Sequence, residues 1–318
     1  MINDGSHISV SLIAPIYGVE RYISRFAESV LGQSYPYVQF VFVNDGTKDS
    51  SMEILNSLIE RSYSHLRERI VIVNKENEGL PAARKTGLEY AEGDYVWHVD
   101  PDDWIEENAV AKIAECAMAT DADIIYFNSY RELEAKTELI VENDYDSSQK
   151  GVYQRDMFNH RAYGCVWNKC VKRSLYENND IYFSKYPHAE DTFLMSQLVG
   201  YADSIVHLDA ALYHYRKDNP QSLTRQGFRK KRRELILNYL SLYELYREAP
   251  RNPVSSMMDD LFYRAGKYSL IYRLGLFEDY PYLADRILRS RICTCSNTSV
   301  PAQLLLKAYA CFRRKIRI

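Results

Sequence analysis

The sequence predicts an α/β protein in which a mixed, mainly parallel sheet is flanked by helices, with a helical extension at the C-terminal end. Two observations lead to this fold class. In the first 130 residues, apolar runs rich in Val, Ile and Phe alternate with segments whose apolar residues recur every three or four positions. The apolar runs are nearly continuous, as in strands that are buried on both faces of a parallel sheet.

Five strands and four helices are expected in this part of the chain. The strands fall at 8–17, 38–45, 69–75, 94–100 and 122–130. The helices fall at 19–33, 49–63, 80–93 and 105–119. The first helix places Val19, Phe26 and Val30 on one stripe, and Asp49 or Ser50 caps the second. Strand and helix thus alternate regularly up to residue 130.

The pattern changes twice after residue 130. Residues 131–190 break into short polar and aromatic pieces, which are expected to form loops and an antiparallel edge of the sheet. From about residue 225 onward, the apolar residues follow a helical period. We therefore predict an α/β domain over residues 1–216 and a basic helical region over residues 217–318.

The composition is that of an ordinary globular protein, with 46% hydrophobic and 26% charged residues among 318. No run of eighteen or more apolar residues occurs, so no membrane-spanning helix is expected. The first residues lack the basic and then apolar pattern of a secretion signal. The six cysteines show no metal-ligand spacing and are expected to be reduced. The cytoplasm is therefore the expected location.

Charge is divided unevenly along the chain. Residues 1–215 carry 19 Lys and Arg against 34 Asp and Glu, whereas residues 216–318 carry 21 against 9. A basic region of this kind faces something anionic, for which nucleic acid and an anionic membrane surface are both candidates. The alternative is that the two parts neutralise each other where they touch.

Four polar segments are expected to meet at one edge of the sheet. They follow predicted strands at 15–20, 44–50, 74–87 and 100–103, and they are rich in Asp, Asn, Gly or Arg. In open α/β sheets, ligands bind beyond the carboxyl ends of the strands. Taken alone, a segment such as "DPDD" at 100–103 is equally well a solvated turn. Four converging segments favour a binding site.

The sequence contains neither a dinucleotide-binding glycine pattern after the first strand nor a P-loop motif. A bound nucleotide diphosphate would therefore need another source of positive charge. Asp100, Asp102 and Asp103 are three carboxylates within four residues, and they repel one another unless a cation lies among them. Mg²⁺ or Mn²⁺ commonly takes one or two carboxylates together with substrate phosphates, so we predict one of these ions as the cofactor.

The motifs, taken in order, resemble those of family 2 glycosyltransferases, which are inverting enzymes with the GT-A fold. They read "PIY…E" at 15–20, "NDGTKDS" at 44–50, "NEGLPAARKTG" at 77–87, "VDPDD" at 99–103 and "HAEDTFL" at 188–194. The resemblance is to the type that builds bacterial surface polysaccharides and covers roughly residues 7–216. It implies a nucleotide-diphosphate sugar as the donor.

The resemblance also implies which residues form the donor site. They are Pro15, Tyr17 and Glu20 near the nucleoside, Asp45 at the base, Arg84 near the donor and Asp100 close to the ribose. Asp102 would bind the metal ion, and Asp103 would be a neighbour of the site. Asn44 replaces the usual first aspartate of the second motif, and Thr47 replaces its serine, both of which are mild changes.

By the same resemblance, Asp191 is the general base that takes the proton of the acceptor hydroxyl. An inverting transfer needs such a carboxylate on the side opposite the leaving diphosphate. The alternative is that Glu190 and Asp191 only stabilise the N-terminus of the following helix through its dipole. The presence of the other motifs favours the catalytic role.

Four positions are matched less closely. Trp167 and Lys169, within "WNK", and Glu190 would line the acceptor side, and His214, within "LYHYR", would reach the metal ion or the diphosphate. A single tryptophan is equally often part of a core, and an ordinary strand histidine explains His214 equally well.

Two basic stretches lie in the C-terminal region, at 225–234 and 304–318. In the second, Leu305, Tyr309 and Phe312 share one helical stripe, and Arg313 and Arg317 lie on the other side. A basic amphipathic helix of this kind binds an anionic membrane surface. The alternative is a helix that packs on its own domain.

The expected function is the metal-dependent transfer of a sugar from a UDP-sugar to a glycan or to a lipid-diphosphate-linked acceptor. The enzyme would act in the cytoplasm, peripheral on the inner face of the cell membrane, with no nucleic acid as partner. One alternative is a nucleotidyltransferase that makes the sugar nucleotide, although the basic glycine-rich loop it needs is missing after the first strand. The other is a non-catalytic glycan-binding or scaffold protein, against which the intact Asp100, Asp102 and Asp191 argue.

Overall fold

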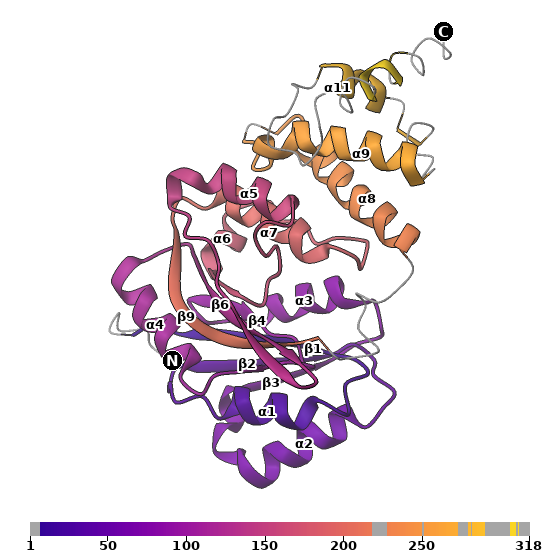
Figure 1. Cartoon of the computed structure of the whole chain (residues 1–318). Helices are drawn as coiled ribbons and strands as arrows, with labels where there is room; N and C mark the ends of the chain where they lie inside the picture. The colour runs from indigo at the N-terminus through magenta and orange to yellow at the C-terminus, as the bar shows by residue number, and fades with distance from the viewer. Residues whose placement is uncertain are drawn as a thin grey trace.

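The computed structural model describes residues 7–217, 228–249, 251–272, 279–280, 282–289, 306–309 and 311. In this part of the chain, a nine-stranded sheet lies between layers of helices (Figure 1). The strands are β1 (Val10–Ile16), β2 (Val38–Asn44), β3 (Ile70–Asn74), β4 (Tyr95–His98), β5 (Trp104–Ile105), β6 (Ile124–Leu133), β7 (Lys136–Ile140), β8 (Lys169–Lys172) and β9 (Ile205–Arg216). The helices are α1 (Ile23–Leu31), α2 (Ser51–Ser62), α3 (Leu80–Glu89), α4 (Ala109–Thr120), α5 (Lys150–Phe158), α6 (Arg173–Glu177), α7 (Glu190–Tyr201), α8 (Phe228–Tyr246), α9 (Met258–Tyr272) and α11 (Leu283–Arg289).

The first four strands of the chain form the parallel half of the sheet, in the order β3-β2-β1-β4. Ile13 of β1 pairs with Val41 of β2 on one side and with His98 of β4 on the other. The carboxyl ends of β2, β1 and β4 therefore lie side by side. The predicted strands and helices of this half are confirmed, with ends that differ by a few residues.

The other half of the sheet is mixed, because β6 pairs in parallel with β9 but antiparallel with β7 and β8. The antiparallel edge expected in residues 131–190 is confirmed as β7, but β8 also runs antiparallel between β4 and β6, inside the sheet, where the sequence did not predict it. Cys170 and Val171 are almost completely buried there. A strand of four residues with such side chains is stable only where neighbours cover it on all sides.

Each face of the sheet has its own hydrophobic core, and β1 contributes to both. Leu12 and Ala14 point to the core beneath α1 and α2, and Ile13 points to the core beneath α3. Gly87 allows α3 to lie close to the sheet, because a Cβ atom there would collide with the side chain of Ile13. This close packing brings α3 directly beside the carboxyl ends of the strands.

The described C-terminal helices share the core of the α3 side. In Figure 1, α8 and α9 continue the layer formed by α5 and α7. The ring of Tyr239 in α8 lies 4.3 Å from that of Phe158, and the hydroxyl of Tyr246 donates to Gln197 at 2.7 Å. The division at residue 216 thus follows secondary structure, whereas the hydrophobic packing is continuous across it.

In the described residues, no helix has both the length and the apolar character needed to cross a bilayer. Most of the basic stretch 304–318 lies outside the described residues. The predicted amphipathic helix there therefore stays a prediction.

Candidate functional site

The four polar segments that follow the strands meet at one edge of the sheet. The segment after β2 contains Asp45, the segment after β4 contains Asp100, and the segment after β3 runs into α3, which carries Arg84. Because these strands are parallel neighbours, their carboxyl ends open on the same side. This arrangement produces two charged centres, one at Asp45 and one at Arg84.

Asp45 forms the first centre and is only 3% exposed. Its Oδ1 accepts hydrogen bonds from Nζ of Lys75 at 3.1 Å and from the backbone N–H of Glu78 at 3.0 Å, and its Oδ2 accepts from the N–H of Gly79 at 2.9 Å. Gly79 has a φ of 90°, which glycine adopts most readily. Asp45 thus holds the loop that leads into α3.

Around this centre, the first loop is tied to the segment after β2. The N–H of Gly18 donates to Oγ1 of Thr47 at 2.9 Å, and the N–H of Ser50 donates to Glu20 at 3.2 Å. Pro15 is buried in β1, whereas Tyr17 is 53% exposed. The structure therefore brings Tyr17 and Glu20 beside the Asp45 loop, and their predicted contact with a nucleoside stays a prediction.

Arg84 forms the second centre and is the side chain around which the carboxylates gather. Its guanidinium is 2% exposed and donates to Asp100 at 2.8 Å, to Glu190 at 2.6 Å and to Asp191. Asp100 follows β4, and Glu190 and Asp191 begin α7, so Arg84 joins segments that lie about 90 residues apart. The prediction that placed Arg84 at the donor did not foresee this central position.

The N-terminus of α7 has a special backbone that places the acidic pair. Ala189 adopts the left-handed conformation with a φ of 63°, which is unusual for a residue other than glycine. The backbone reverses there, and Glu190 and Asp191 occupy the first turn of α7. The helix dipole favours negative charge at this end. Stabilisation of the helix end and a catalytic role of the acidic pair are therefore compatible, since the same helix end also supports the ion pairs with Arg84.

Burial and neighbouring charges shift the pKa values of this cluster. Burial raises the pKa of Asp100 to about 6, with Asp191 and Asp102 adding to the effect and Arg84 opposing it. Burial and the adjacent Asp191 raise the pKa of Glu190 well above its usual value. Burial alone would lower the pKa of Arg84, but the surrounding carboxylates raise it well above normal. The guanidinium is therefore permanently charged.

Asp103 is a structural anchor for the turn that carries Asp100 and Asp102. Its carboxylate accepts from the hydroxyl of Tyr213 at 2.7 Å and from the N–H of Arg216 at 2.6 Å. The N–H of Asp100 donates to the same Tyr213 hydroxyl at 3.1 Å, and Arg216 Nε donates to the carbonyl of Asp102 at 3.1 Å. The sequence singled out Arg216 only as a residue that could reach the metal ion or the diphosphate, and it gave no sign of Tyr213, because nothing local relates β9 to this turn.

The carboxylates fit a divalent cation chemically, but they do not form a complete cage. Asp100, Glu190 and Asp191 bond the guanidinium of Arg84, so that three carboxylates share one cation, and Asp102 and Asp103 lie beside Asp100. Within the described ranges, no three His, Cys, Asp or Glu side chains are arranged to hold a metal ion. Oxygen ligands from substrate phosphates and water complete such sites in many Mg²⁺ and Mn²⁺ enzymes. Asp102, together with Asp100, would hold the ion.

Trp167 and Lys169 have surroundings that differ from those of the predicted acceptor contacts. Trp167 is 5% exposed and stacks on Tyr213 at 4.6 Å, so its faces are covered by the core. Lys169 is 1% exposed, and its Nζ donates to the carbonyls of Tyr163 and Cys165. The expected acceptor contact of Trp167 and Lys169 therefore has no support in the geometry.

His214 also has surroundings that a metal ligand would not have. Its two ring nitrogens lie 2.8 Å from Glu106 and 2.7 Å from Glu132. Its ring stacks between those of Trp104 and Tyr130. Both nitrogens are therefore engaged, and the ordinary explanation of a strand histidine is favoured over metal binding. Its partners Glu106 and Glu132 could not be identified from sequence, because the three residues come from separate elements.

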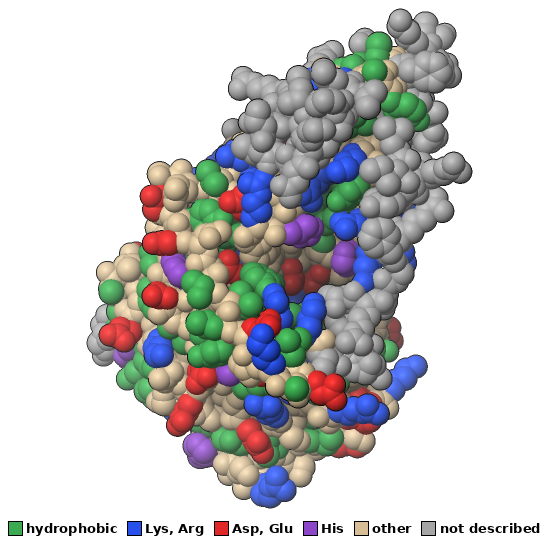
Figure 2. Space-filling view, in the orientation of Figure 1, with side chains coloured by type: hydrophobic (Ala, Val, Ile, Leu, Met, Phe, Trp, Pro, Cys, Tyr) green, Lys and Arg blue, Asp and Glu red, His purple; other side chains and the backbone are tan. Residues whose placement is uncertain are grey.

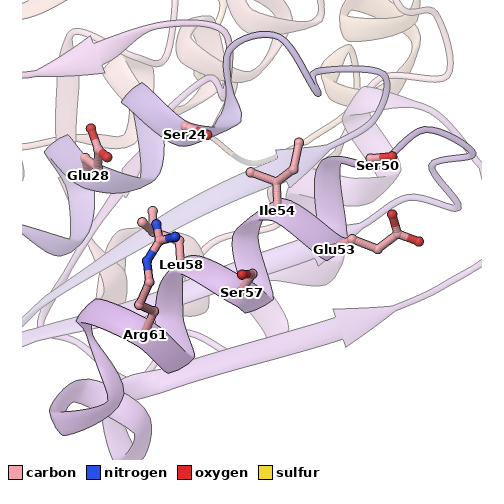
Figure 3. Close-up of a pocket in the computed structure, with 8 residues that line it drawn as sticks. All are labelled: Ser24, Glu28, Ser50, Glu53, Ile54, Ser57, Leu58 and Arg61. Carbon is pink, nitrogen blue, oxygen red and sulfur yellow. The ribbon is translucent and has the colours of Figure 1, made fainter.

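A hollow lies between the sheet and the C-terminal helices, as the space-filling view shows (Figure 2). Acidic side chains lie at its bottom, and Lys, Arg and His side chains lie along its upper side. A second depression of about 350 Å³ lies between α1 and α2 (Figure 3). It is lined by residues such as Ser24, Glu28 and Arg61, and none of the predicted site residues lines it. The charged centres are therefore distinct from that depression.

Comparison with known proteins agrees with this geometry. The family model described as glycosyl transferase family 2 matches residues 11–178. EpsH of Bacillus subtilis is 29% identical over 242 residues, which are 74% of this chain and 67% of EpsH. The glycosyltransferase GlyA of Streptococcus pneumoniae is 31% identical over 217 residues, which are 65% of this chain but only 30% of GlyA.

Two solved structures share the fold over nearly the whole chain. S. aureus TarS 1–349 in complex with UDP-GlcNAc superposes with a TM-score of 0.66 at 19% identity, over 96% of this chain and 88% of TarS 1–349. The mannosyltransferase PcManGT of Pyrobaculum calidifontis, in complex with GDP-Man and Mn²⁺, has a TM-score of 0.54 at 16% identity and covers 96% of this chain and 80% of its own. Fold, motifs and family model lead to one conclusion: this chain belongs to glycosyltransferase family 2.

Proposed function

We propose that this glycosyltransferase moves a sugar from a UDP-sugar to a hydroxyl of a glycan or lipid-diphosphate-linked acceptor, with inversion. The observation that carries the proposal is the position of Arg84, which bonds Asp100 on the donor side and Asp191 on the other. Arg84 thereby holds the carboxylate on the donor side and the proposed general base at a fixed separation. The UDP-GlcNAc in the TarS structure and the GDP-Man and Mn²⁺ in the PcManGT structure support a nucleotide-sugar donor and a divalent cation.

In this mechanism, Asp191 accepts the proton of the acceptor hydroxyl as the hydroxyl oxygen bonds to the anomeric carbon. The bond between that carbon and the diphosphate oxygen breaks, and the electron pair leaves with the nucleotide diphosphate. Asp191 suits this role because its side chain is 22% exposed and therefore accessible, while Arg84 fixes its orientation. General-base assistance contributes roughly 10²–10⁴-fold to the rate.

Asp102 and Asp100 would hold Mg²⁺ or Mn²⁺, which supplies positive charge to the leaving diphosphate. Asp103, Tyr213 and Arg216 position these two carboxylates through the hydrogen bonds around the turn. The Asp45 centre fixes the loop beside the predicted nucleoside position. Family membership favours this proposal over a nucleotidyltransferase or a non-catalytic scaffold. We further propose that the enzyme works in the cytoplasm at the inner face of the cell membrane.

The test is isothermal titration of the purified chain with UDP, in the presence of Mn²⁺ or EDTA. We expect metal-dependent binding that Asp102→Ala abolishes and Asp191→Asn preserves. The turnover of a donor, measured as UDP released from a panel of UDP-sugars, should fall 10²–10⁴-fold in Asp191→Asn. Glu115→Gln, on the exposed face of α4, is the matched control and should change neither quantity. Binding of UDP that is equal with EDTA and in Asp102→Ala would contradict the donor-site assignment.

A further inference from the structure

Basic side chains of α8 lie over the segment that leads into the acidic pair. Asn238 of α8 is 1% exposed, its side-chain amide donates to the carbonyl of His188 at 2.8 Å, and its Oδ1 accepts from Ser184 at 2.5 Å. Lys231 precedes Asn238 by seven residues, which is two helical turns and the same face of the helix. α8 therefore presents Lys231 along the side on which it holds His188.

A second group of basic side chains adjoins the first. Arg264 of α9 donates to the carbonyl of Phe158 at 2.9 Å and to Oδ1 of Asn159 at 2.5 Å, directly before His160. Arg232 of α8 lies over the ring of Tyr268, also on α9, at 5.1 Å. We call His160, His188, Lys231, Arg232 and Arg264 together the basic wall.

The charges of the basic wall act on one another. Burial lowers the pKa of His188 to about 4, and Lys231, Arg232 and His160 contribute in the same direction. Burial, Arg264 and Arg232 also lower the pKa of His160. Among the described residues, Glu234, which is 3.7 Å from Lys230, and Asp260, which accepts from Asn159 at 3.3 Å, are carboxylates close to this group. Cationic side chains nevertheless gather around the two histidines, and such a surface favours an anion.

The basic wall is close to the proposed base. His188 precedes Asp191 by three residues, so their Cα atoms are at most roughly 11 Å apart. Figure 2 shows acidic side chains at the bottom of the hollow and basic and histidine side chains on its upper side. The short separation of His188 and Asp191 therefore brings the acidic pair and the basic wall within reach of one extended molecule.

We infer that the basic wall binds a phosphate or diphosphate ester carried by the acceptor, and so directs the acceptor hydroxyl to Asp191. The inference rests on the proposed function, because it takes Asp191 as the base. The diphosphate of the donor is an unsuitable occupant, since the proposed metal site places it among the carboxylates after β4. Lys and Arg are the side chains that recognise phosphate oxygens most strongly.

The experiment uses the full chain saturated with UDP and Mn²⁺, so that the donor site is filled. Isothermal titration with glycerol 3-phosphate measures the phosphate site, and glycerol is the uncharged comparison. We expect the wild-type chain to bind glycerol 3-phosphate and not glycerol, and the double variant Lys231→Gln/Arg232→Gln to bind it at least tenfold more weakly. Lys230→Gln, one position along α8 and 71% exposed, is the control and should change the affinity less than twofold.

A second arm distinguishes the source of the phosphate. Sedimentation with phosphatidylcholine vesicles, with and without phosphatidic acid, measures binding to a lipid-borne phosphate. Binding in both arms that the double variant weakens supports a lipid-linked acceptor, and binding of glycerol 3-phosphate alone supports a soluble phosphorylated acceptor. Binding to the anionic vesicles alone assigns the basic wall to the membrane surface and overturns the inference, as does equal binding of glycerol 3-phosphate by the double variant.

The control for folding is the single variant Lys231→Gln, which retains the contact of Arg232 with Tyr268. If the double variant is not stably folded, the single variant replaces it in the titration. We expect Lys231→Gln to bind glycerol 3-phosphate several-fold more weakly than the wild-type chain, and unchanged binding by this variant overturns the inference. The UDP affinity of every variant is measured in the same samples. A wild-type chain that binds no UDP contradicts the proposed function, whereas UDP binding without a phosphate site contradicts only this inference.

Discussion

The two charged centres at the carboxyl edge of the sheet are built on opposite principles. Asp45 is a single buried charge that three donors neutralise and bind, namely Lys75 and two backbone N–H groups. Arg84 is a single buried charge that faces three carboxylates, with Asp102 and Asp103 nearby. We call the first centre complete because its one buried carboxylate has a lysine partner, although Lys75 also pairs with the exposed Glu78 at 2.5 Å. The second centre sets one guanidinium against three carboxylates and has an excess of negative charge. A cationic ligand is therefore expected at the Arg84 centre.

The largest effect is expected when the Arg84 centre loses its cation. Arg84→Met fills the volume but leaves buried carboxylates without their partner, so we expect a loss of about 3–5 kcal/mol in the free energy of unfolding at pH 8. Urea denaturation measures it. The loss should shrink at pH 5, because protonation of Asp100, whose pKa burial raises to about 6, removes negative charge. A loss that grows as the pH falls would show that the carboxylates are not the cause.

A smaller effect is expected at His98, which lies next to the Arg84 centre. Both of its ring nitrogens are buried without a hydrogen bond in the described structure, and burial followed by the charge of Arg84 lowers its pKa to about 3. The unfolded chain therefore takes up a proton at higher pH than the folded chain does. The stability that neutral His98 contributes is complete above the unfolded pKa of about 6.5 and decreases as the pH falls toward 3.

Between pH 8 and pH 5, the wild-type chain should consequently lose about 2 kcal/mol more than His98→Phe does. Urea denaturation at the two pH values measures the difference. His65→Phe, at an exposed histidine, is the matched control and should leave the pH dependence as in the wild-type chain. Identical pH dependence in His98→Phe would mean that His98 takes up its proton at the same pH in the folded and the unfolded chain.

The Asp45 centre should tolerate a loss of charge better than the Arg84 centre does. Asp45→Asn keeps the shape but replaces an ionised acceptor with a neutral amide, so we expect a cost of about 1–3 kcal/mol. Urea denaturation alongside Arg84→Met compares the two centres directly. If Asp45→Asn is the more damaging of the two, the view that excess charge distinguishes them is wrong.

The smallest effect is expected at Ala189, which places the acidic pair of the Arg84 centre. Ala189→Gly should change stability by less than about 1 kcal/mol, because glycine accepts the left-handed conformation but adds freedom to the unfolded chain. Ala189→Val should cost more, since a β-branched residue is strongly disfavoured there. Thermal denaturation measures both, and an equal effect of Gly and Val would show that the backbone at 189 does not constrain the pair.

The regular part of the fold and most of the charged residues could be predicted from the sequence. Continuous apolar runs identified β1 to β4 and β6, because burial on both faces leaves a local record in the chain. The polar segments after these strands identified Asp45, Arg84 and Asp100, since parallel strands bring such segments to one edge, whereas Asp191 was identified only by the resemblance to family 2 glycosyltransferases. The position of β8 inside the sheet left no comparable record in its four residues.

Only the tertiary structure decided what each charged residue contacts. "AARKTG" and "AED" lie more than 100 residues apart, and neither contains the information that Arg84 bonds Glu190 and Asp191. Likewise, Trp167 and Lys169 are buried, and His214 is bound by Glu106 and Glu132, because of the packing of β8 and β9 against distant strands. The chemistry of a side chain is local to its residue, whereas its burial and its partners arise from contacts between segments far apart in the chain.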